Sequence, residues 1–451
     1  MRLLIRDCAI ATVDEAGTEH ASGHLMVDQN RIVAVGAGPA PAELVESVDR
    51  VVDGIGCLAT PGLVNTHHHL YQWATRGLAQ QEDLFGWLGA LYPLWARIDA
   101  DLVGATAAAG LGWLARSGCT TSTDHLYVFP RDAGDLFGAE VEAARRIGLR
   151  FHPCRGSMDL GESDGGLPPD EIVEDRDAVL TATEQAIDSY HDPAPDSMLR
   201  VAVAPCSPFS VTGELMRESA ELARARGVRL HTHLAETREE EQFCKDQFGC
   251  TPAEYVERLG FLGEDVWFAH CVHLDPSAIG RLGDAGTAVA HCPSSNARLG
   301  AGIAPLAEML EAGVPVGLGV DGPASNEQGA LGTEMHAAVL MARARGGPRA
   351  LTARQALALG TAGGARCLGR ADELGSLEAG KLADIALWRL DGPVHAGIDD
   401  PVAALVFGER PPLALLLVDG QPVVEDGVLL TADEPALTAA AAKAAGRLAG
   451  R

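Results

Sequence analysis

Lysine is scarce in this chain. Among its 451 residues only Lys245, Lys381 and Lys443 are lysines, and arginine supplies the rest of the positive charge. Lysine and arginine together number 35 against 62 aspartate and glutamate residues, which gives a net charge of −27. Because such a surface repels phosphate backbones and anionic lipids, we expect neither nucleic acid nor a membrane as a partner.

Three other features are missing. The ten cysteines include no C-x-x-C pair, which indicates free thiols in a reducing compartment. The stretch MRLLIRDCAIATVDE at the start has no long apolar leader segment, and no apolar run elsewhere reaches membrane-spanning length without interruption. No glycine-rich phosphate loop follows an early strand, which disfavours a dinucleotide-dependent dehydrogenase. We therefore expect a soluble cytoplasmic protein.

The middle of the chain alternates short apolar, β-branched runs with longer helical patterns. Such alternation is typical of parallel βα units. About eight units in roughly 270 residues is the size of a (β/α)₈ barrel, which we predict in preference to a doubly wound open sheet. The expected strands are Leu58–Asn65, Cys119–Asp124, Arg150–Arg155, Leu199–Pro205, Val228–His233, Val266–Ala269, Ala288–Ala290 and Val316–Val320.

The two ends of the chain have a different pattern. Residues 1–57 and 372–430 contain short alternating apolar segments separated by turn residues, as in Asp28-Gln29-Asn30 and Asp419-Gly420. We predict one small β-sandwich domain built from both ends. Residues 58–371 would then form the catalytic barrel, and the alanine-rich residues 431–451 a helical tail.

Histidine and aspartate residues stand where several predicted barrel strands end. His67 and His69 end the first strand, His233 the fifth, His270 the sixth and Asp321 the eighth. Residues two apart in a strand point to the same side, and all strand ends of a barrel open on one face. The sequence therefore predicts a metal site assembled from distant parts of the chain.

Imidazole and carboxylate ligands suit one divalent metal ion. We expect Zn²⁺, with Fe²⁺ as the alternative. Such an ion lowers the pKa of a bound water molecule toward about 7. Glu236 lies three residues beyond His233 and could take the proton of that water and pass it to a leaving group. The alternative for Glu236 is a carboxylate that only stabilises the first turn of a helix.

The motifs PGLVNTHHH, HTHLAE, AHCVH, HCPSSN, GLGVDGPASN and GSLEAGKLADIAL together resemble the amidohydrolase superfamily over essentially the whole chain. The resemblance implies that His67, His69, His233 and Asp321 bind metal and that His270 polarises the reacting centre. Two-metal members carry a bridging lysine after the fourth strand, where this chain has Ala204-Pro205-Cys206. The resemblance therefore implies a single-metal aminohydrolase of nucleobases, triazines or related rings, and commonly a homo-oligomer.

Further segments narrow the expected substrate. His67-x-His69-x-x-Gln72 resembles the guanine deaminases, but these place an arginine where Cys206 follows Pro205. The segments HHHLYQWATRG, LFGWLGALYPLWARI, GSMDLGESDGGLPP, APCSPFSVT and HLAETREEEQFC resemble the bacterial 8-oxoguanine deaminases. In the substrate pocket we expect Gln72, the ring of Trp87 and Cys206, narrowed by Trp73 and covered by the loop 159–169.

The resulting hypothesis is hydrolysis of 8-oxoguanine to urate and ammonia, with Glu236, His270 and Asp321 as the catalytic residues. Isocytosine or another amino-heterocycle is the alternative substrate, since it presents a similar edge. A triazine amino- or chlorohydrolase is a second alternative, and a barrel without catalytic activity is a third. The complete set of ligand residues together with Glu236 argues against an inactive barrel.

Overall fold

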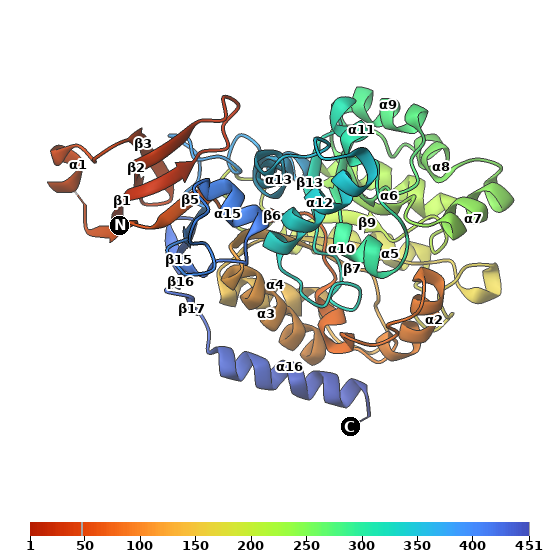
Figure 1. Ribbon diagram of the computed structural model, residues 1–451. Helices are drawn as coiled ribbons and strands as arrows, with labels where there is room; N and C mark the ends of the chain where they lie inside the picture. Colours follow the sequence, from red (N-terminus) through yellow and green to blue (C-terminus); the bar gives the residue numbers. More distant parts are fainter. Residues whose placement is uncertain (47, 451) are drawn as a thin grey trace.

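The predicted barrel is present. The structure is a computed structural model that describes residues 1–46 and 48–450. Eight parallel strands form a closed ring, completed where Leu318 pairs with Asn65 (Figure 1). In chain order they are β6 (Leu63–Asn65), β7 (Cys119–Leu126), β8 (Arg150–Ser157), β9 (Ala202–Pro205), β10 (Arg229–Leu234), β11 (Val266–His270), β12 (Ala288–His291) and β13 (Val316–Leu318).

Helices surround the ring, as expected for βα units. α6 shows why they form here: the Thr212 side chain caps its first turn by accepting from Leu215 N, and Gly227 ends it in the left-handed conformation. The helices of the barrel region are α2 (Leu84–Trp95), α3 (Ala100–Arg116), α4 (Leu136–Ile147), α5 (Arg176–Tyr190), α6 (Gly213–Arg226), α7 (Arg238–Phe248), α8 (Pro252–Arg258), α9 (Pro276–Ala285), α10 (Pro293–Arg298), α11 (Leu306–Glu311), α12 (Leu331–Gly346), α13 (Ala353–Ala358) and α14 (Gly364–Cys367), with short turns η1 (Leu70–Thr75), η2 (Glu162–Asp164) and η3 (Leu359–Gly363).

Both ends of the chain contribute to a second, mainly antiparallel sheet of nine strands. The halves join where β5 pairs with β14, and the sheet lies to one side of the barrel in Figure 1. Its strands are β1 (Arg2–Ala11), β2 (Glu19–Asp28), β3 (Arg31–Ala37), β4 (Arg50–Asp53), β5 (Cys57–Pro61), β14 (Ile385–Arg389), β15 (Leu413–Val418), β16 (Gln421–Glu425) and β17 (Val428–Leu429).

The first barrel strand needs a correction. The run Leu58–Asn65 was predicted as one strand, but it divides at Gly62 between β5 of the sheet and β6 of the barrel. Gly62 packs so closely on Thr120 that a Cβ there would lie 2.1 Å from its methyl group. Only glycine fits this crossing between the two sheets.

Three helices lie outside the barrel region. α1 (Ala42–Glu46) and α15 (Pro401–Phe407) interrupt the two β-rich segments. α16 (Glu434–Leu448) lies within the predicted tail and packs against α3 through a stripe made of Leu437, Ala441, Ala444 and Leu448 (Figure 1). Among the described residues no helix is both long and apolar enough to cross a membrane.

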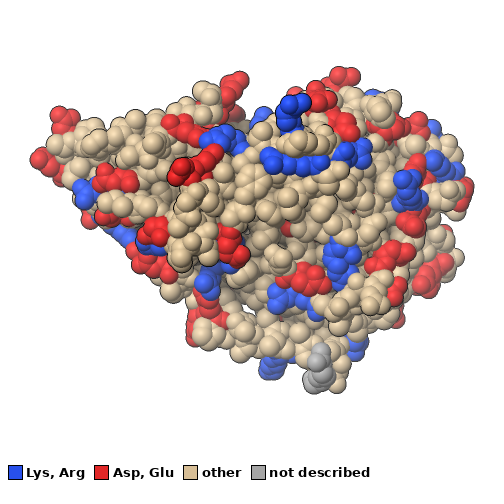
Figure 2. Space-filling model, viewed as in Figure 1, with Lys and Arg blue, Asp and Glu red and all other residues tan. Residues whose placement is uncertain are grey.

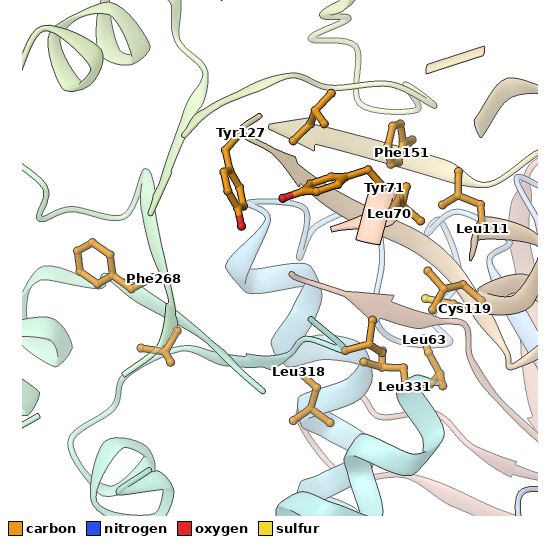
Figure 3. Packing of buried hydrophobic residues seen from close by; sticks show 14 of the residues in the cluster. Leu63, Leu70, Tyr71, Leu111, Cys119, Tyr127, Phe151, Phe268, Leu318 and Leu331 are labelled. Atoms are coloured by element: carbon orange, nitrogen blue, oxygen red, sulfur yellow. The ribbon is translucent and has the colours of Figure 1, made fainter. Parts of the chain in front are cut away.

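The surface and the core follow the composition. On the face drawn in Figure 2, acidic and basic side chains are interspersed, with one short row of basic side chains near the top. Below the surface, residues from strands and helices all along the chain pack into one large apolar cluster, among them Leu63, Phe268 and Leu331 (Figure 3). Tyr71 and Tyr127 pack edge to face in this core, with ring centroids 5.9 Å apart, and lie beside the strand ends that carry the site.

We expect Gly118→Ala to destabilise the protein by more than about 2 kcal/mol. Gly118 has φ +92°, and a Cβ there would lie 2.0 Å from the Trp388 ring, which belongs to the other sheet. Gly280→Ala is the control, because this helical glycine has nothing within 4 Å of a Cβ; alanine should be neutral or stabilising there. Urea denaturation measures both changes, and similar midpoints for the two variants would contradict the expectation.

Candidate active site

The four predicted metal ligands lie together at the carboxyl-terminal mouth of the barrel. His67 and His69 follow β6, His233 lies in β10, and Asp321 follows β13. Asp321 Oδ1 lies 3.3 Å from Nε2 of both His67 and His69. Nε2 of His69 lies 3.1 Å from Nε2 of His233. Strand ends far apart in the sequence thus bring four ligand atoms to one point.

The alternation expected for the three consecutive histidines holds, although β6 ends earlier, at Asn65. His68 continues the extended path, because it forms a parallel bridge with Asp321. His67 and His69 therefore project together toward Asp321, and the His68 ring turns away to accept from His69 N.

Backbone carbonyls fix the tautomers of two of these histidines. Nδ1 of His69 lies 2.7 Å from the carbonyl of His125, and Nδ1 of His233 lies 2.7 Å from the carbonyl of Cys206. A carbonyl oxygen only accepts, so both Nδ1 atoms carry the proton. Nε2 of each neutral ring then carries no proton, and the lone pairs of the two Nε2 atoms face one another.

The same reasoning extends to His67 through a buried relay. His231 Nδ1 donates to the carbonyl of Trp267 at 2.8 Å, which leaves His231 Nε2 as an acceptor. His67 Nδ1 donates to that atom at 2.9 Å. His67 Nε2 is therefore also unprotonated, and it is buried without a hydrogen-bond partner among the described residues.

The donor set fits a divalent metal ion. Three imidazole lone pairs and a carboxylate converge with no proton between them, an arrangement that only a cation stabilises. Burial lowers the pKa of His67 and His233 well below the ordinary value, so that both remain neutral ligands. His67, His69, His233 and Asp321 could hold Zn²⁺ or Fe²⁺ here.

Glu236 and His270 lie beside this cluster. His270 Nε2 is 3.5 Å from Glu236 Oε2 and 4.0 Å from Asp321 Oδ2, and its Nδ1 donates to the side-chain oxygen of Asn296 at 2.9 Å. Burial raises the pKa of Glu236 to about 7. Burial alone would lower the pKa of His270, but the nearby carboxylates of Glu236 and Asp321 outweigh it and raise that pKa.

The backbone around these groups is strained. Ala235, His270, Cys271 and Asp321 all have φ between +50° and +72°, a region that residues other than glycine rarely occupy. Such conformations persist only where surrounding contacts enforce them. One contact of this kind comes from Glu240, whose two carboxyl oxygens accept from Ala235 N and Glu236 N, each at 2.8 Å.

The three predicted substrate-binding residues all line the pocket above the cluster. Trp87 contributes its ring and donates from Nε1 to the carbonyl of Ala324. Gln72 is 1% exposed, and neither atom of its amide has a partner among the described residues. Cys206 is buried in the wall. The remaining lining residues are mostly apolar or aromatic and include Leu84, Leu88, Tyr92, Tyr127, Phe209, Leu299 and Ser325.

Two expectations about the pocket were wrong. Trp73 does not narrow it, because its ring lies under the Arg76 guanidinium in a groove next to α16. The loop 159–169 contributes no lining residue. It instead supports the segment after β9, because the Asp159 carboxylate accepts from the backbone N and the hydroxyl of Thr212.

Several residues of the site were missed. His125 stacks on His233 at 4.8 Å, and it follows directly on a predicted strand, so the rule used for the other histidines could have found it. His231, Asn296 and Glu240 act through partners distant in the sequence or through the backbone. Only the three-dimensional contacts identify them.

The fold and the site are those of a metal-dependent hydrolase. A model of the amidohydrolase family matches residues 58–423. The chain is 43% identical to the 8-oxoguanine deaminase of Pseudomonas aeruginosa, with 93% of each chain covered. It is 38% identical to an isoxanthopterin deaminase from an unknown prokaryotic organism, over 94% of this chain and 93% of that protein.

A solved structure is similar over nearly the full length. The atrazine chlorohydrolase of Arthrobacter aurescens, complexed with zinc, has a TM-score of 0.93 and 36% identity, covering 98% of this chain and 100% of that one. The chain belongs to the amidohydrolase family. It is an enzyme of the hydrolytic deaminase type.

We expect His69→Gln to lower the metal content of the purified protein from about one ion per chain to a small fraction. This substitution removes one of the three imidazole nitrogens that would bind the ion, so the remaining ligands hold it less tightly. His336→Gln is the control, because His336 contacts the carbonyl of Val406 and the ring of Phe407, both outside the site. Elemental analysis measures both variants, and a full metal complement in His69→Gln would contradict the assignment.

Proposed function

We propose that this enzyme hydrolyses 8-oxoguanine to urate and ammonia with one bound divalent metal ion, Zn²⁺ in preference to Fe²⁺. The observation that carries the proposal is the buried amide of Gln72, a residue that lines the pocket; neither its donor nor its acceptor has a hydrogen-bond partner among the described residues. An N–H beside a ring carbonyl satisfies both atoms. The 43% identity to an 8-oxoguanine deaminase supports the same substrate.

The proton transfers follow from the positions of the side chains. A divalent ion held by His67, His69, His233 and Asp321 would polarise a water molecule and lower its pKa. Glu236 takes one proton from the water and delivers it to the ring nitrogen next to C2. The oxygen of the water forms a new bond to C2. Glu236 then moves the second proton from this oxygen to the exocyclic amino group, the bond between C2 and that group breaks, and ammonia leaves.

His270 and Asp321 orient the reacting groups. Asn296 holds the His270 ring so that Nε2 points between Glu236 and Asp321. The raised pKa of His270 favours the protonated ring, whose Nε2–H can stabilise negative charge that develops on the attacked centre. Ser295 donates to Asp321 Oδ2 at 2.6 Å, which leaves Oδ1 to face His67 and His69. The apolar and aromatic walls exclude bulk water and suit a flat ring.

Isocytosine is the second candidate substrate, because it also places a ring N–H beside a carbonyl and an amino-bearing carbon between two ring nitrogens. A chlorotriazine has no ring carbonyl to pair with Gln72. The partner is thus a small heterocycle, and purine breakdown inside the cell is the setting that the proposal implies.

The substrate is tested by ammonia release from 8-oxoguanine, guanine, isocytosine, cytosine and a chlorotriazine, using enzyme of known metal content. We expect rapid release from 8-oxoguanine and slow release from guanine, since Cys206 stands where guanine deaminases carry an arginine. Turnover of isocytosine alone would move the assignment to the second candidate. A metal-loaded enzyme that releases no ammonia from 8-oxoguanine would overturn the substrate.

We expect Glu236→Gln to lower kcat by about 10²–10⁴-fold, since the amide cannot accept and return a proton. The metal content should stay at the wild-type level, because Glu236 is not among the four converging ligands. Glu239→Gln is the matched control: this neighbouring carboxylate lies in the exposed first turn of α7 and should leave kcat unchanged. Near-normal turnover by metal-loaded Glu236→Gln would contradict the role of Glu236.

A further inference from the structure

A second cavity opens at the opposite end of the barrel from the active site. It has a volume of about 570 Å³, within the range of small-molecule sites. Arg229 begins β10, whereas His233 near the other end of the same strand belongs to the metal cluster. The lining residues come from the amino-terminal ends of neighbouring strands, from the carboxyl-terminal ends of α5 and α6 and from the chain after α14, and include His152, His191, Arg200, Arg224, Arg229, Asp265 and Gly369.

The cavity is basic in a strongly acidic protein. Three arginines line it together with a single acidic residue, Asp265, although the chain has a net charge of −27. Asp265 is already paired with Arg224 at 3.0 Å. Behind the wall, Glu373 is shared between Arg200 and Arg370. The four arginines in and behind the wall thus have only two carboxylates to pair with, those of Asp265 and Glu373.

Arg229 is the residue left without a counter-ion. Within the described residues its guanidinium makes no hydrogen bond and no ion pair, and Nε is buried. Its position is set by close packing, since a Cβ at Gly369 would lie 2.7 Å from its Nη1. A partly buried cation without a partner is costly, so the arrangement is more stable with an anion in the cavity.

His152 adds a second unpaired donor or acceptor to the same wall. It is 3% exposed, and its Nδ1 has no partner among the described residues. Burial, with the nearby cations of Arg229, Arg370 and Arg200, lowers the pKa of His152 well below its ordinary value. The neutral ring can then offer one N–H to an anion held by the arginines.

We propose that this cavity is a binding site for a small phosphorylated metabolite, with Arg229 as its main contact. The planar guanidinium matches two oxygens of a phosphate group. The volume leaves room for an organic part beside the phosphate, so we commit to a phosphomonoester rather than the free ion. This proposal is independent of the substrate proposed for the active site.

The site also adjoins the support of the metal cluster. The His152 ring lies 5.9 Å from Trp267, and the Arg229 guanidinium lies 5.8 Å from the same ring on the cavity side. Trp267 stacks at 4.3 Å on His231, which orients His67. Two stacked rings, those of Trp267 and His231, therefore separate the basic cavity from His67 in the metal cluster.

The test is calorimetric titration of the metal-loaded enzyme with ribose 5-phosphate, inorganic phosphate and ribose. We expect one saturable site per chain for the two phosphates, no binding of ribose, and a thermal midpoint that rises with phosphate concentration. Tighter binding of ribose 5-phosphate supports the phosphomonoester. Inorganic phosphate binding at least as tightly would overturn the metabolite and assign the cavity to the free ion.

The variant Arg229→Gln should weaken phosphate binding at least tenfold. In phosphate-free buffer its thermal midpoint should equal or exceed that of the wild type, because an uncompensated cation has been removed. Arg281→Gln is the control: this half-buried arginine pairs with Glu257 outside the cavity and should leave binding unchanged. If Arg229→Gln does not fold, His152→Gln should still weaken binding.

Two outcomes would overturn the site. Phosphate binding that persists unchanged in Arg229→Gln would place the anion elsewhere, such as at the metal cluster. A thermal midpoint that rises with protein concentration but not with either phosphate would mean that an acidic side chain of a second copy fills the cavity.

Discussion

The active site depends on one electrostatic constraint: unprotonated imidazole nitrogens and a carboxylate meet with no proton among them. The carbonyls of His125 and Cys206 hold the protons of His69 and His233 on the far side of each ring, and His231 does the same for His67. The barrel supplies these acceptors from separate strand ends. A divalent cation relieves the repulsion, so folding and metal binding reinforce each other.

The same constraint explains why related enzymes of this family can act on different heterocyclic substrates. In the proposed mechanism the metal cluster and the pair of Glu236 and His270 would activate water and move protons, and neither task would select a particular heterocycle. Selection falls to a few polar groups in an otherwise apolar pocket, and single hydrogen bonds there can change specificity greatly. Relatives at similar identity accordingly include an 8-oxoguanine deaminase, an isoxanthopterin deaminase and an atrazine chlorohydrolase. Among the described residues that line this pocket, Gln72 has a buried side-chain amide without a hydrogen-bond partner.

Much of this arrangement could be predicted from the sequence, because a barrel strand leaves a local pattern and a polar residue after it marks the carboxyl-terminal face. The eight strands and the gathering of His67, His69, His233 and Asp321 follow from that rule. The break at Gly62 could not be predicted, since it arises from contact with Thr120 on another strand. The outward orientation of the Trp73 ring could not be predicted either. Helical turns such as η1 have no strict alternation that would indicate which side chains face the pocket.

The two ends of the barrel have opposite electrostatic character. At the carboxyl-terminal end, acceptors accumulate and require a cation; at the amino-terminal end, Arg229 and its neighbours leave donors that require an anion. Trp267 and His231 lie stacked between them. Because His231 sets the tautomer of His67, a shift of Trp267 caused by filling the basic cavity would act on a metal ligand through two contacts.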